Sequence, residues 1–145
     1  MAPLSSETLH ATTVAINGRA VMLYGPSGSG KSDLGLRLID RGASLVSDDY
    51  TILRREAGRL LATPPLQIAG RMEVRGVGLI DLPFQSDVEV SLLVELVDLV
   101  ERLPETQSRV FAGVSVPVLR ALAFEASAPI KIELMLRRIL DGENS

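Results

Sequence analysis

One stretch decides the fold of this 145-residue chain, and it reads Gly25, Pro26, Ser27, Gly28, Ser29, Gly30, Lys31 and Ser32. An apolar run over residues 19–24 precedes it, and an amphipathic segment over residues 31–41 follows it. The stretch matches the phosphate-binding pattern Gly-x-x-x-x-Gly-Lys-Ser, and its context is a strand before the loop and a helix after it. We therefore predict an α/β domain with a phosphate site where the strand ends.

Each part of this loop has a physical task. The glycines let successive backbone N–H groups turn toward an anion, and the N-terminus of the helix adds the positive end of its dipole. Lys31 supplies a compact positive charge to the terminal phosphates, and Ser32 offers a hydroxyl to Mg²⁺. Only two of the 15 basic residues are lysines, so a lysine at this point indicates that its compact ammonium group is needed there. A Gly/Ser turn that matches by chance is the alternative, and the strand-helix context disfavours it.

Two adjacent carboxylates, Asp48 and Asp49, follow a predicted short buried strand over residues 43–47. Ligands of open α/β sheets bind at the carboxyl ends of strands, so we expect this pair to lie beside the phosphate loop. One carboxylate can then orient a metal ion or its water shell, and the other can accept a proton from a hydroxyl. A solvated Asp-Asp turn or a helix cap is the alternative.

The rest of the chain is rich in predicted strands. Asn17-Gly18 predicts a tight hairpin between residues 9–16 and 19–24. Apolar residues at alternate positions predict a strand over 88–96, and Gly42 fits a helix end. Further strands are predicted over 50–53, 59–62, 72–74, 79–82 and 114–118, and a second helix is predicted after Ser127. We expect the aromatic residues to lie in the core, and Gly76 and Gly78 to permit a close backbone approach.

Composition narrows the function. The net charge of −3 argues against a general nucleic-acid binder, and an aromatic content of 3% argues against stacking of single strands. The absence of cysteine and the single histidine, His10, exclude thiolate and His-cluster metal sites. No apolar run reaches the roughly 18 residues of a membrane span, and the first residues lack the features of a signal peptide. We expect a single cytoplasmic domain over residues 1–145 with no membrane partner.

Residues 21–32, Asp48-Asp49 and the run from Met72 to Asp81 together resemble the catalytic domain of the HPr kinase/phosphorylase family. The specific part is Glu73-Val74-Arg75-Gly76-Val77-Gly78, which is similar to the signature of that family. The resemblance extends over residues 10–138. It implies a strand-rich P-loop kinase domain similar to phosphoenolpyruvate carboxykinase, with few helices. It also implies ATP-dependent phosphorylation of a serine on HPr, the phosphocarrier of the bacterial sugar phosphotransferase system, with Mg²⁺ and in a homohexamer.

The resemblance also implies roles for individual residues. Lys31 would contact the transferred phosphoryl group, and Ser32 and Glu73 would bind Mg²⁺. Asp49, with Asp48 beside it, would take the proton of the serine. Two further catalytic residues match family positions: His10, which lies before the loop, and Arg102, which would balance charge. From the residues alone, Glu73 and Arg75 share one face of a strand and suit metal and phosphate contacts, with a surface ion pair as the alternative. His10 alone could equally be structural.

One departure bears on the reverse reaction. The Pro-Val-Arg-Pro-Gly-Arg loop that the family uses in dephosphorylation reads here Pro117-Val118-Leu119-Arg120-Ala121-Leu122. We therefore predict a kinase with weak or absent phosphorylase activity. The family's bifunctional members carry an N-terminal domain for which this chain has no room. Two other functions stay open: a small-molecule P-loop kinase or NTPase, and a nucleotide-sensing module without turnover.

Overall fold

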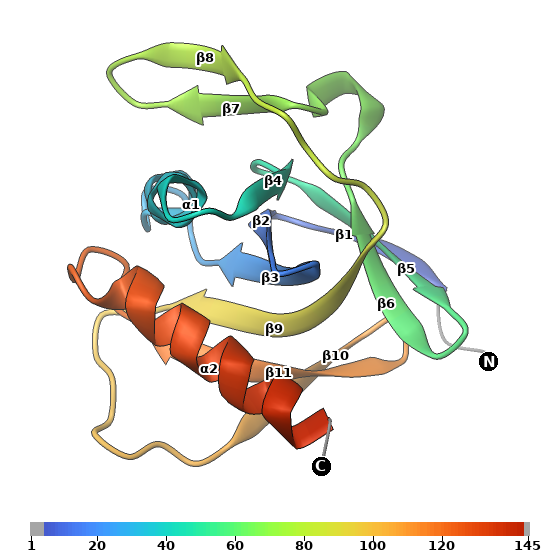
Figure 1. Ribbon diagram of the computed structural model, residues 1–145, viewed down its shortest axis with the longest axis vertical. Helices are drawn as coiled ribbons and strands as arrows, with labels where there is room; N and C mark the ends of the chain where they lie inside the picture. The colour runs from blue at the N-terminus through green and yellow to red at the C-terminus, as the bar shows by residue number, and fades with distance from the viewer. Residues whose placement is uncertain (1–4, 144–145) are drawn as a thin grey trace.

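The computed structural model describes residues 5–143, which form a strand-rich α/β fold with two α-helices (Figure 1). The helices are α1 (Lys31–Asp40) and α2 (Ala128–Glu143), with a short 3-10 helix at Leu66–Ile68. The strands are β1 (Ser6–Leu9), β2 (Ala11–Ile16), β3 (Arg19–Tyr24), β4 (Ser44–Ser47), β5 (Thr51–Glu56), β6 (Arg59–Thr63), β7 (Arg71–Val74), β8 (Gly78–Asp81), β9 (Val88–Leu96), β10 (Gln107–Phe111) and β11 (Val114–Ala121). This confirms the predicted fold class.

Nine strands form one sheet, in the order β1-β5-β6-β9-β3-β2-β4, with β11 paired to β9 and β10 paired to β11. β3 and β11 both run parallel to β9. β2 runs antiparallel to both β3 and β4, so β3 and β4 point in the same direction. Their carboxyl ends therefore reach the same edge of the sheet, although β2 lies between them. The prediction that these two strand ends share an edge of the sheet is confirmed. The sequence did not indicate that β2 lies between them.

The hairpin that joins β2 to β3 turns at Asn17 and Gly18. Both residues have positive φ angles, 51° and 79°, as the predicted two-residue turn requires. The predicted strand over residues 9–16 is interrupted at His10, which separates β1 from β2. This interruption matters because it takes His10 out of the regular strand pairing. β10 is a strand that the sequence analysis did not predict.

Aliphatic side chains fill two cores, one on each face of the central strands. Val21 and Leu23 of β3 pack with Leu34 of α1 and Ile132 of α2, whereas Met22 faces the other core. Each such buried side chain stabilises the fold by about 1.5–3 kcal/mol. The prediction that aromatic residues lie in the core is wrong for most of them. Phe111 is buried, but three others are largely exposed, and they are Tyr50, Phe84 and Phe124.

The two helices are joined at their surfaces. Arg41, just after α1, donates hydrogen bonds to both carboxylate oxygens of Glu133 on α2. These hydrogen bonds raise the pKa of the Arg41 guanidinium above its ordinary value. Gly42 follows with a φ of 112°, which fits its predicted place at the helix end.

No helix in the described range 5–143 is both long enough and apolar enough to span a membrane.

The β7–β8 hairpin forms a separate two-stranded sheet beside α1 (Figure 1). Its turn contains Gly76 and Gly78, with φ angles of 85° and 118°. A Cβ atom on either glycine would meet nothing within 4 Å, so no other segment of the described chain approaches them closely. Their positive φ angles suit the left-handed turn. β7 ends at Val74, which places Arg75 in this turn rather than on the strand face of Glu73.

Candidate active site

The phosphate loop connects β3 to α1 and holds its shape through glycine. Gly30 has a φ of 97°, and a Cβ atom there would lie 2.9 Å from Cζ of Phe124. The backbone conformation therefore disfavours a side chain at this position, and Phe124 would have to move aside to admit one. The first backbone N–H groups of α1 have no partner within the helix, so they are available to an anion.

Lys31 is buried, and its ammonium group lies across the loop. Its Nζ donates hydrogen bonds to the backbone oxygens of Gly25, at 2.7 Å, and Pro26, at 3.1 Å. The hydroxyl oxygen of Ser29 is buried and has no hydrogen-bond partner in residues 5–143. A buried ammonium, an unpaired hydroxyl and free helix N–H groups form a donor set that fits phosphate oxygens.

Asp48 joins three elements of the fold. It is only 6% exposed. Its Oδ1 accepts hydrogen bonds from Ser32 Oγ of α1, at 2.7 Å, and from Thr12 Oγ1 of β2, at 2.9 Å. Its Oδ2 accepts a hydrogen bond from the backbone N–H of Glu73 on β7, at 3.1 Å. Asp48 therefore fixes the phosphate loop, the sheet edge and the β7–β8 hairpin relative to one another.

Asp49 has the opposite environment. Its side chain is 60% exposed, and its Oδ1 lies 2.7 Å from Nε2 of His10. Its φ of 72° is unusual for a residue with a side chain, although aspartate tolerates it better than most. Its backbone N–H donates to Thr12 Oγ1 at 3.3 Å. The His10 ring in turn stacks on Tyr50, with ring centroids 4.8 Å apart.

Comparison with known proteins decides the family. Residues 3–120 match the model of the HPr Serine kinase C-terminal domain. The chain belongs to this family. The HPr kinase/phosphorylase of Clostridium tetani is 42% identical over 81 residues, which cover 55% of this chain and 27% of that protein. That of Chlorobium phaeovibrioides is 33% identical over 147 residues, which cover 90% of this chain and 44% of that protein.

A solved structure agrees with the HPr kinase relationship. The HPr(Ser) kinase/phosphatase from Coxiella burnetii is 29% identical, with a TM-score of 0.83 over 96% of this chain and 99% of that one. The matched regions make up less than half the length of the two curated relatives described above. The resemblance in the sequence is thus confirmed, and so is the P-loop kinase fold.

Within this HPr kinase fold, the residues expected to bind Mg²⁺ come together. Ser32 and the backbone of Glu73 both contact Asp48. The described part of the chain holds no cluster of three or more His, Cys, Asp or Glu side chains suited to a metal. Protein sites for Mg²⁺ commonly use one or two carboxylates together with substrate phosphates, so Ser32 and Glu73 beside a phosphate loop would suit that ion, with Asp48 hydrogen-bonded to Ser32.

Arg102 stands apart from these residues. It lies in the exposed segment 97–106 between β9 and β10, and within residues 5–143 it makes no hydrogen bond or ion pair. Most of the altered loop sequence, Pro117 to Ala121, forms the second half of β11 and pairs with β9 or β10. Sequence reasoning missed Thr12 and placed Tyr50 in the core. Neither residue belongs to a motif. Each joins the site through a contact with a residue far away in the sequence, Thr12 with Asp48 and Tyr50 with His10.

Proposed function

We propose that this chain is an ATP-dependent protein serine kinase that phosphorylates HPr in the cytoplasm. The observation that carries the proposal is Asp48, which links Ser32 of the phosphate loop to the Glu73 backbone while Asp49 beside it contacts His10. This arrangement supports a metal-binding role for the Ser32 hydroxyl and a proton-accepting role for Asp49, the two roles that phosphoryl transfer to a hydroxyl requires. The names of the relatives, HPr kinase/phosphorylase, support HPr as the substrate.

The site residues have two tasks: one group binds the phosphoryl donor, and the other handles the proton of the acceptor serine. Lys31 and the loop N–H groups bind the phosphates and offset the negative charge that develops during transfer. Ser32 and Glu73 hold Mg²⁺, with Asp48 orienting the Ser32 hydroxyl. When bound, Mg²⁺ neutralises charge on the phosphate oxygens and helps to align them. Each of these groups acts on the phosphoryl donor.

Asp49 acts on the acceptor serine. Its Oδ1 is engaged by His10, and its exposed carboxylate can be reached by a protein substrate. The serine hydroxyl passes its proton to Asp49 as its oxygen bonds to the terminal phosphorus, and the bond to the leaving diphosphate breaks. His10 holds the Asp49 carboxylate in place. Arg102, from the exposed segment 97–106, would add positive charge once HPr is bound.

Transfer of labelled phosphate from ATP to HPr tests the proposal, with an HPr variant in which the acceptor serine is alanine as substrate control. Lys31→Ala should lower transfer by about 10³-fold or more, because it removes the charge that stabilises the transition state. Lys131→Ala is the matched control, since Lys131 is exposed on α2 and, within residues 5–143, its ammonium group pairs only with Glu125. Retained transfer by Lys31→Ala, or turnover only with small molecules, would refute the assignment.

The reverse reaction has its own test. We propose that phosphorylase activity is weak or absent, because the Pro-Gly turn and final arginine of the family loop are missing at Arg120-Ala121-Leu122. Serine-phosphorylated HPr incubated with this chain and inorganic phosphate should release pyrophosphate slowly or not at all. Rapid release would contradict this. A homohexamer, proposed from the family resemblance, is tested by sedimentation.

A further inference from the structure

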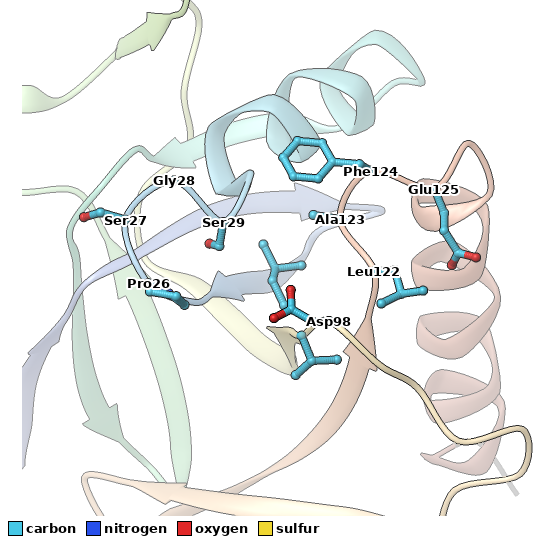
Figure 2. Close-up of a pocket in the computed structure, with 11 residues that line it drawn as sticks. Pro26, Ser27, Gly28, Ser29, Asp98, Leu122, Ala123, Phe124 and Glu125 are labelled. Carbon is cyan, nitrogen blue, oxygen red and sulfur yellow. The ribbon is translucent and has the colours of Figure 1, made fainter.

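The two flanks of the phosphate loop are built differently. On the flank of β9, loop residues 26–29 line a cavity of about 560 Å³ together with Asp98 and Phe124 (Figure 2). On the other flank, β2 lies between β3, which leads into the loop, and β4, which leads to Asp48 and Asp49. The start of β2 therefore lies close to both the loop and the aspartates.

Thr12, the second residue of β2, contacts both aspartates through one hydroxyl group. Its Oγ1 donates a hydrogen bond to Asp48 Oδ1 at 2.9 Å and accepts one from the backbone N–H of Asp49 at 3.3 Å. A hydroxyl carries one hydrogen and two lone pairs, so it serves both partners at once. Because Thr12 is fully buried, water cannot replace either bond when the hydroxyl is removed.

The methyl group of Thr12 packs against α1 at Gly35. A Cβ atom on Gly35 would lie 3.1 Å from Thr12 Cγ2 and 3.3 Å from Met72 Cε. Glycine is less favourable than alanine in a helix interior, but here the missing side chain lets β2 approach the helix closely. Threonine is β-branched, so fixing its methyl group also fixes the direction of its hydroxyl.

We propose that Thr12 is a positioning residue that sets the aspartate pair for phosphoryl transfer, and that Gly35 makes room for it. Through Asp48, Thr12 acts on the Ser32 hydroxyl, which donates to the same Oδ1 atom. Through the backbone N–H of Asp49, it supports the left-handed turn, with a φ of 72°, that orients the Asp49 carboxylate. This inference rests on the proposed function and adds to it a residue outside the sequence motifs.

The HPr transfer assay with Thr12→Val tests the role of the hydroxyl. Valine keeps the shape and the methyl contact, but it neither donates to Asp48 nor accepts from Asp49. We expect kcat to fall by about 10- to 100-fold, as for a small misplacement of a catalytic group. The KM for ATP should stay unchanged, because the substitution leaves loop residues 26–29 intact. Thr12→Ser keeps the hydroxyl and should retain most of the activity.

Thr13→Val is the matched control. Thr13 is the next residue of β2 and is equally buried, but its hydroxyl is hydrogen-bonded to Thr51 rather than to an aspartate. Thr13→Val also removes a buried hydroxyl, so it should lower stability and leave kcat unchanged. Circular dichroism at the assay temperature measures the folded fraction of each variant. An equal fall in kcat for both valine variants, or an unchanged kcat in folded Thr12→Val, would overturn the positioning role.

Gly35→Ala provides a second test in which the hydroxyl is kept. The added methyl group presses on the Thr12 methyl, whereas Met72 is flexible and can move aside. Alanine favours the helix itself, so α1 stays formed. We expect kcat to fall in Gly35→Ala and to recover when Thr12→Ser is added, because serine lacks the methyl group. No fall in kcat, or a fall that Thr12→Ser does not reverse, would overturn the link through Thr12.

The same assays separate this inference from the proposed function. If the unaltered protein transfers no phosphate to HPr, the proposed function fails and the role of Thr12 fails with it. If the unaltered protein transfers phosphate, Lys31→Ala does not, and Thr12→Val is as active as the unaltered protein, only the role of Thr12 fails.

Discussion

Asp48 and Asp49 are neighbours in the chain, yet they lie in opposite environments. Asp48 is buried, and its two carboxylate oxygens accept hydrogen bonds from α1, β2 and β7. Asp49 faces solvent, and within residues 5–143 its side chain is hydrogen-bonded only to His10. A left-handed turn of the backbone at Asp49, with a φ of 72°, directs the two side chains into these different surroundings.

The difference separates their tasks. A carboxylate with both oxygens occupied is held in one position, so it suits the orientation of Ser32 and a metal ion. An exposed carboxylate keeps an oxygen available and can meet a protein hydroxyl. Substitutions at the two positions therefore test this separation of tasks, provided that both the free energy of unfolding and phosphoryl transfer are measured.

The largest effect is expected for Asp48→Ala. The change leaves the Ser32 and Thr12 hydroxyls and the Glu73 N–H without their acceptor in a largely buried place. We expect a loss of about 2–4 kcal/mol in the free energy of unfolding, together with loss of phosphoryl transfer. Urea denaturation and the HPr transfer assay measure the two quantities. An unchanged unfolding free energy would show that Asp48 does not join the three elements.

A smaller and purely functional effect is expected for Asp49→Asn. The amide cannot accept the serine proton, so transfer should fall by about 10²- to 10⁴-fold. Because the side chain is exposed, the unfolding free energy should stay within about 0.5 kcal/mol. The same two measurements apply, with Asp33→Asn on the exposed face of α1 as the matched control. A stability loss as large as that of Asp48→Ala would erase the distinction between the two aspartates.

The smallest effect is expected for Tyr50→Leu. Tyr50 stacks on His10, so its loss should loosen the support of Asp49 rather than remove a reacting group. We expect transfer to fall by about 2- to 10-fold, as for the loss of one aromatic pair. The double variant Tyr50→Leu with Asp49→Asn should be no slower than Asp49→Asn alone. If the rate losses of the two single variants multiply in the double variant, Tyr50 does not act through the His10–Asp49 pair.

Local patterns predicted much of the fold. The Asn17-Gly18 turn, the strand over 88–96 and the strand-loop-helix unit around Lys31 all depend on residues close in sequence, and each is present. β10 escaped prediction because four of its five residues are exposed and show no apolar alternation. The interruption at His10 also escaped, since β1 pairs with β5 whereas β2 pairs with β3 and β4.

The phosphate loop can be predicted from local sequence, because its glycines, Lys31 and Ser32 all lie in one short segment. Local sequence also placed two carboxylates at a strand end. Long-range contacts, in contrast, bury Asp48 with three hydrogen bonds and leave Asp49 exposed against His10, which stacks on Tyr50. Only the structure brought Asp98 and Phe124 to one cavity. These outcomes depend on strand order and on contacts between residues far apart in the chain, which local pattern does not encode.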